Sequence, residues 1–126
     1  MSWAKDIKRL CDKGGHDLGE LAKAIKIELF SGIVQDTRVD TGRLRGNWQI
    51  QENTPATGSI EVADGTPQGQ IPSYQQTEII NESTEVGLTY FVNNLVYAEV
   101  WEAKDAMVAR NISRVKANVK KMADAL

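Results

Sequence analysis

Apolar side chains in the first third of the chain recur at intervals of three and four residues, the spacing of an amphipathic helix. The pattern is interrupted at Gly14-Gly15, and two adjacent glycines disfavour a helix interior by about 2 kcal/mol relative to alanine. We therefore expect two helical pieces, over residues 2–13 and 16–31, with a bend at the glycines and an end near Ser31-Gly32. The apolar positions are Trp3, Ile7, Leu10, Leu18, Leu21, Ile25 and Leu29.

Alternation of apolar and polar residues predicts strands in the middle of the chain. Trp48 and Ile50 alternate with polar neighbours over residues 47–51, and a longer alternation covers residues 85–92. Shorter strands are expected at 59–63 and 77–80. The chain therefore predicts an antiparallel sheet of three or four strands. The inner face of its last strand would carry Val86, Leu88, Tyr90 and Val92.

A polar run between the helices and the first strand, residues 36–46, is typical of a tight turn that leads into a strand. Asp40 can accept hydrogen bonds from backbone amides two or three residues on, and Gly42 can adopt the positive φ that such turns need. We therefore expect Asp40, Thr41 and Gly42 to form the scaffold of this turn.

The last segment of the chain predicts a helix with an apolar stripe at intervals of three and four. This stripe packs on the chain's own sheet or, alternatively, on a partner helix. Residues 97–102, which precede it, fit either a helix or an extended segment. Helices at both ends of an antiparallel sheet predict an α+β fold in two layers. The stripe consists of Val108, Ile112, Val115, Val119, Met122 and Leu126.

All three prolines and several glycines fall within residues 53–76. Loops longer than about 12 to 15 residues are uncommon in compact domains unless they are functional or disordered. We therefore predict that residues 64–75 form a mobile loop.

Length and composition fit one domain over residues 1–126, since 126 residues with 41% hydrophobic content suffice for a single core. No run approaches the roughly 18 to 20 apolar residues of a membrane span, and the start lacks the apolar stretch of a secretory signal. We expect a soluble, cytoplasmic protein that does not bind membranes.

Charge is unevenly distributed along the chain. Residues 46–103 contain eight acidic residues and no lysine or arginine, whereas residues 1–45 and 104–126 carry net charges of +2 and +4. The acidic segment is either a solvated surface or a complement to the basic helix of a neighbouring copy. The isoelectric point of about 5.4 argues against specific nucleic-acid binding. A small regulatory module that binds nucleic acid through the basic helix 107–121 remains the alternative.

Candidate chemistry is sparse. The single cysteine, Cys11, excludes an internal disulfide, and together with the single histidine, His16, it leaves too few ligands for a zinc or iron cluster. The acidic pairs Glu99/Glu102 and Asp36/Asp40 have no histidine partner, so solvated carboxylates are the expected state. We therefore expect no enzyme activity, no metal and no cofactor.

Two segments carry a resemblance to a known family: VDTGRLRGNW at 39–48 and FVNNLVYAEVWE at 91–102. Their order and spacing resemble the minor tail or neck proteins of long-tailed bacteriophages, the tail-completion or head-tail joining proteins. In that family an N-terminal helix leads to a VDTGRLR-like turn, strands, an N-x-x-Y-A-x-x-x-E segment and a C-terminal helix. The chain departs from the pattern at residues 103–106, which lack the family's glycine-rich stretch and proline, and in the longer segment 53–76.

The resemblance implies a structural virion protein that forms rings at the junction of head and tail, with a tail terminator as the close variant. Its partners would be copies of itself and the neighbouring connector and tail-tube proteins, and its location the virion after synthesis in the host cytoplasm. The family supplies no catalytic residues, and its motif positions are scaffold and contact residues. Because Leu44 alternates with its neighbours, we expect Arg43 and Arg45 on the opposite face of a strand. The candidate subunit contacts in the two segments are Arg43, Arg45, Tyr97, Trp101 and Glu102. The charge of the basic last helix, which could face the acidic segment of a neighbour, adds Arg110, Arg114 and Lys121.

Overall fold

A computed structural model describes residues 3–69 and 88–126 of the chain. Within these residues the fold mixes helix and strand, which confirms the expected class at that level. The helices are α1 (Trp3–Asp12), α2 (Leu18–Asp36), α3 (Arg43–Gly46), α5 (Ala98–Asp105) and α6 (Met107–Asp124), and the strands are β1 (Trp48–Glu52) and β2 (Thr89–Asn93).

The break between the first two helices lies where the glycines predict it. Helix α1 ends at Asp12, and Gly15 adopts a positive φ of 72° in the connection. Asp17 then caps α2, because its carboxylate accepts a hydrogen bond of 3.0 Å from the backbone amide of Glu20. The interruption is confirmed, and the cap fixes where the second helix begins.

Helix α2 does not end near Ser31-Gly32, so that expected boundary is wrong. The helix continues to Asp36, and Gly32 lies inside it, facing α6. A Cβ atom at this position would overlap the side chains of Asn111 and Arg114 on α6. Gly32 therefore allows α2 and α6 to approach each other closely, and it does not terminate α2.

The sheet of the described residues has two antiparallel strands, in which Ile50 lies opposite Phe91. Strand β1 confirms the strand expected at 47–51. The strand expected at 59–63 is wrong: these residues are irregular, and the backbone amide of Ile60 donates to the side chain of Asn47 at 2.8 Å. The expected strand 77–80 and residues 85–87 of the last strand lie outside the described residues. A sheet of three or four strands is therefore not shown.

The inner face of β2 differs from the expected one. Phe91, and not Tyr90 or Val92, enters the main core, where its ring stacks on Phe30 at 4.3 Å and on Trp48 at 4.8 Å between centroids. Leu88, expected on the inner face, is exposed. Residues 89–92 are all of types common in strands, so the sequence pattern does not show which alternate positions face the core.

Helix α6 buries a stripe at strict intervals of four, which shares only Val115 and Val119 with the expected stripe. Ile112, Met122 and Leu126, expected inside, are exposed. Val115 and Val119 pack with Leu10 of α1 and Leu21 of α2, whereas Met107 belongs to the core cluster that contains Trp48 of β1, so the stripe meets both the chain's own helices and its sheet. The buried positions of α6 are Met107, Asn111, Val115, Val119 and Ala123.

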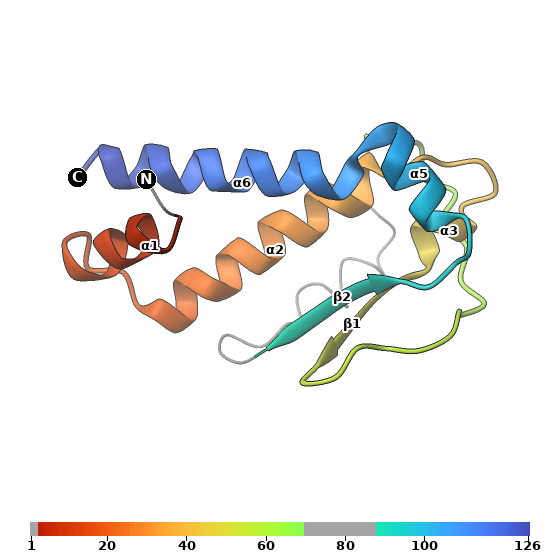
Figure 1. Cartoon of the computed structure of the whole chain (residues 1–126), viewed down its shortest axis with the longest axis horizontal. Helices are drawn as coiled ribbons and strands as arrows, with labels where there is room; N and C mark the ends of the chain where they lie inside the picture. The colour runs from red at the N-terminus through yellow and green to blue at the C-terminus, as the bar shows by residue number, and fades with distance from the viewer. Residues whose placement is uncertain (1–2, 70–87) are drawn as a thin grey trace.

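The elements are arranged along one long axis (Figure 1). Helix α2 runs between α6 and the two-stranded sheet, with α1 beside the C-terminal turns of α6 at one end and α3 and α5 at the other. Among the helices of residues 3–69 and 88–126, none is long and apolar enough to cross a membrane. Because α1 and the last turns of α6 form one end of the axis and α3 and α5 form the other, different elements supply the side chains of the two ends.

Candidate functional site

The two segments that carry the resemblance, 39–48 and 91–102, contact each other in the fold. Leu44 of α3 packs against Leu95 and Ala98, which form a small buried cluster at the start of α5. The side-chain amide of Asn93 donates a hydrogen bond of 2.7 Å to the backbone carbonyl of Leu44. Apolar packing and a backbone contact therefore join segments that are about fifty residues apart in sequence.

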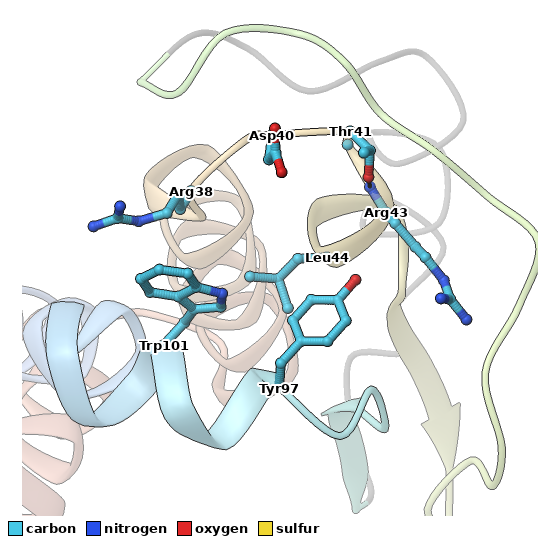
Figure 2. A pocket seen from close by; sticks show the side chains of 8 residues that line it. Arg38, Asp40, Thr41, Arg43, Leu44, Tyr97 and Trp101 are labelled. Carbon is cyan, nitrogen blue, oxygen red and sulfur yellow. Dashed lines mark hydrogen bonds between the residues drawn. The ribbon is translucent and has the colours of Figure 1, made fainter.

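A surface hollow of about 440 Å³ lies where these segments meet. Figure 2 shows Leu44 between the turn on one side and the rings of Tyr97 and Trp101 on the other. Arg38 and Arg43 extend to opposite sides of the hollow (Figure 2). The structure thus gathers the expected turn scaffold and three of the candidate contacts, Arg43, Tyr97 and Trp101, around one site.

The turn beside the hollow depends on Gly42. This residue has a φ of 87°, as expected, and a Cβ atom there would overlap the backbone of Asp64 and Gly65. Its carbonyl accepts hydrogen bonds from the amides of Asp64 and Gly46, at 2.8 and 2.9 Å. Gly42 is therefore required both by the turn and by the chain that crosses over it.

Asp40 does not act as the expected acceptor in the turn. The amide of Arg43 donates instead to the hydroxyl oxygen of Thr41, at 3.3 Å, and Asp40 is an exposed residue that lines the hollow. Residues 43–46 then form the short helix α3, so the expected passage from turn directly into strand is also wrong.

Arg45 does not lie on the face opposite Leu44, because the helical turn buries both side chains. Arg45 is 0% exposed; its Nε donates to the carbonyl of Val34 at 2.9 Å and its Nη1 to that of Thr66 at 2.5 Å. Burial lowers the pKa of its guanidinium, and the nearby carboxylate of Asp64 opposes that shift. Arg45 is thus a buried anchor within its own chain and not a surface group available to a neighbour.

The described part of the expected mobile loop, residues 64–69, is bound to the corner between α2 and α3. The amide of Gly69 donates to the carbonyl of Gln35 at 2.7 Å, and the side chain of Gln68 donates to that of Asp36 at 2.9 Å. Residues 70–75 lie outside the described residues. The mobility of the loop stays a prediction.

The indole of Trp101 packs against Arg38, which was not among the candidate residues inferred from the sequence. The guanidinium of Arg38 lies 4.2 Å from the centre of the Trp101 ring and makes two hydrogen bonds of 3.1 Å to Asp105. Hydrogen bonding to Arg38 lowers the pKa of the Asp105 carboxyl below its ordinary value. Sixty-seven residues separate Arg38 from Asp105, and no local pattern indicates that they meet.

Glu102, a candidate contact, is used within the chain. Its carboxylate accepts hydrogen bonds from the amides of Val108 and Ala109, at 2.8 and 3.2 Å, and so caps α6. Helix α5 ends just before this cap, where Ala106 adopts a positive φ of 51°. The segment after Tyr97, which the sequence left open, is therefore a separate helix with a sharp corner at Ala106.

The basic candidates on α6 do not line the hollow. Arg114 forms an ion pair of 3.1 Å with Glu28 of α2 and also donates to the Glu28 carbonyl at 3.3 Å. Arg110 and Lys121 are exposed, about three helical turns apart. The structure therefore does not bring these three together in one site.

The lining of the hollow combines apolar and polar groups. Its floor is apolar and its rim polar, and neither Cys11 nor the exposed His16 lines it. No group of three or more His, Cys, Asp or Glu residues that can hold a metal ion occurs in the described part of the chain. No family model, no curated protein and no solved structure matches this chain.

Proposed function

We propose that this chain is a ring-forming structural protein of the neck or tail of a long-tailed bacteriophage, a tail-completion or head-tail joining protein. It acts by binding copies of itself and the neighbouring connector and tail-tube proteins, and it is not an enzyme. The observation that carries the proposal is that segments 39–48 and 91–102, which bear the resemblance, pack together and line one hollow.

Exposed apolar side chains beside the hollow support a role in protein binding. Val96 is 92% exposed and Val100 is 51% exposed, next to the half-buried Tyr97 and Trp101. Single exposed apolar residues are ordinary, but these two valines lie four residues apart and each directly precedes a residue that lines the hollow, so we take them as part of a surface that another protein covers. A partner that covers this surface would remove both valines from water.

The structure also supports dividing the candidate residues into two groups. Gly42, Arg45 and Glu102 hold the backbone around the hollow and face inward or cap a helix. Arg43, Tyr97 and Trp101 line the hollow itself, where a partner can reach them. We assign the subunit contact to the second group, together with Val96 and Val100.

The proposal is tested by complementing a phage from which the gene has been deleted. Val96→Asp combined with Val100→Asp places charges on the proposed contact without touching the core, so we expect a folded protein and at least a tenfold loss of infectious particles. Leu18→Asp is the matched control, because Leu18 is an exposed apolar residue on α2 and does not line the hollow. The control should restore the wild-type yield.

Two outcomes contradict the proposal. One is a normal particle yield after deletion of the gene, and the other is equal complementation by the two variants. A purified chain that binds duplex DNA with a steep dependence on salt would instead support the nucleic-acid module.

A further inference from the structure

The corner between α5 and α6 depends on one residue in a left-handed conformation. Ala106 has a φ of 51° and a ψ of 39°, values that bring a Cβ atom too close to the following carbonyl oxygen. In the described part of the chain, Asn53 is the other non-glycine residue with a positive φ. Asparagine tolerates this conformation because its side chain can bond to the local backbone, whereas alanine has no such group. The surrounding structure therefore holds Ala106 against its own preference.

The local sequence favours a helix that runs straight through this corner. Residues 88–126 contain neither glycine nor proline, the two residues that most disfavour a helix. The amide of Ala106 donates to the carbonyl of Glu102, and the amide of Arg110 donates to the carbonyl of Ala106, both at 2.8 Å. Because these bonds have the spacing of an α-helix, a change of φ and ψ at Ala106 alone would make one helix over residues 98–124.

The carboxylate of Glu102 replaces backbone acceptors in the bent corner. In a continuous helix the amides of Val108 and Ala109 would donate to the carbonyls of Lys104 and Asp105. In the bent corner Glu102 accepts both, at 2.8 and 3.2 Å. Both arrangements therefore provide acceptors for these amides, so neither has to leave them unpaired.

Helix α5 is attached to the rest of the molecule by few buried side chains. Of its eight residues, Ala98 alone is buried, and it packs with Leu44 of α3 and with Leu95. Trp101 is half-buried beside the exposed Arg38. Segments with few buried apolar contacts open at a lower free energy than the core does. We therefore expect α5 to leave α3 while α1, α2 and α6 stay packed.

We propose that Ala106 is a hinge between two states of the chain. In the bent state α5 turns away from the axis of α6 (Figure 1) and supplies one wall of the hollow. In the extended state α5 continues α6 as one helix, and the two walls of the hollow separate. The bent state is the one that binds the neighbouring protein, because that protein contacts Arg43 of the turn together with Tyr97 and Trp101. The inference rests on the proposed function, for which it names a regulation of the same site.

The hinge regulates association through the fraction of chains that are bent. The affinity for a partner that needs the bent state falls in proportion to that fraction, so extended chains do not associate. A partner that contacts both walls of the hollow binds the bent state alone and shifts the chain toward it. Contact with the correct neighbour therefore completes the hollow.

The reaction rate of a buried thiol measures how often α5 leaves α3 in the free, full-length chain. The reporter is Ala98→Cys, because Ala98 is 7% exposed in the bent state. A second reporter, Ala123→Cys, lies in the core between α1 and α6 and becomes accessible only when those helices separate. Both reporters carry Cys11→Ala, so that each chain has one thiol. An aromatic disulfide reagent modifies the thiol, and absorbance follows the reaction.

We expect the thiol at position 98 to react at least about tenfold faster than the thiol at position 123, since the hinge exposes only the first. Ala106→Gly should slow the reaction at position 98 at least about fivefold, because glycine adopts the left-handed conformation without strain and is disfavoured in a helix. Ala106→Val should accelerate the reaction, because a β-branched residue is strained at positive φ.

A matched control separates the swing of an intact helix from its melting. Ala103 is exposed and lies in α5, so it is helical in both states. If α5 moves as a helix, Ala103→Gly should leave the reaction at position 98 unchanged within about twofold. If α5 melted instead, Ala103→Gly would accelerate the reaction, because glycine disfavours the helix that is lost.

Three results would overturn the hinge. They are equal reaction rates of the two reporters, an Ala106→Gly chain that reacts no more slowly, and an Ala103→Gly chain that reacts several times faster. These rates are measured without a phage, so such a failure leaves the proposed function standing. Equal complementation by the Val96→Asp, Val100→Asp protein and its Leu18→Asp control would reject the proposed function whatever the rates.

The link between the hinge and binding is tested by complementation with chains that keep Cys11 and Ala98. Ala106→Val should reduce the yield of infectious particles, because fewer chains are bent, whereas Ala106→Gly should restore the wild-type yield. Any other pattern of the two yields would contradict the assignment of binding to the bent state.

Discussion

Residues that are not exposed themselves set the shape of the hollow. Gly42 lets the chain at Asp64 cross above the turn, and Arg45 ties that crossing chain to α2 through the carbonyls of Val34 and Thr66. The sequence indicates the positive φ of Gly42, because turns favour glycine there. In the expected strand, residues 44 and 45 would point to opposite faces, so the burial of Arg45 could not be predicted. The residues instead form a helical turn, which buries both side chains.

Gly42→Ala should lower the free energy of unfolding by about 2 to 4 kcal/mol, because strain at positive φ adds to a Cβ that overlaps the backbone of Asp64. Gly58→Ala is the matched control: Gly58 has a φ of 74° but open space around it, so only the strain of about 1 kcal/mol applies. Urea unfolding measures both. Equal losses would show that the crossing at Gly42 is not tight.

Arg45→Met should cost about 3 to 5 kcal/mol, because it leaves buried carbonyls and the carboxylate of Asp64 without the guanidinium. The same substitution at the exposed Arg43 should change stability by less than about 0.5 kcal/mol. Thermal unfolding of the two variants decides the point. Similar melting temperatures would contradict the burial of Arg45.

At the scale of elements, the corner between α5 and α6 holds the aromatic wall of the hollow. Arg38 forms an ion pair with Asp105 and a cation–π contact with Trp101. Glu102 caps α6, which follows Ala106 with its left-handed backbone conformation. Periodicity predicts α1, β1 and the existence of α6 well. Periodicity misplaces the end of α2 and the buried stripe of α6. Gly32 and most of that stripe pack against other helices, and local sequence does not show which helices will meet.

The pair Arg38–Asp105 predicts a dependence of stability on pH. Arg38 lowers the pKa of Asp105 below its ordinary 3.8, so the pair stabilises the fold above that pH, and the contribution is lost as the pH falls through the lower folded pKa. The wild type should therefore lose more stability between about pH 5 and pH 2.5 than Arg38→Gln does. The Lys120–Asp124 ion pair is present in both proteins, so its own dependence on pH cancels when the two profiles are compared. Parallel pH profiles would refute the role of Arg38.

At the scale of the whole molecule, the hollow arises only from the fold. The contact between segments 39–48 and 91–102 requires that α2 and the sheet bring them together, so the sequence suggests both segments but not the hollow between them.

Imaging of intact phage particles by single-particle electron microscopy tests the central claim most directly. We predict several copies of this chain in a closed ring at the junction of head and tail, with the α5 surface around Val96 and Val100 covered by a neighbouring protein. Complete, infectious particles whose density and protein content lack the chain would contradict it.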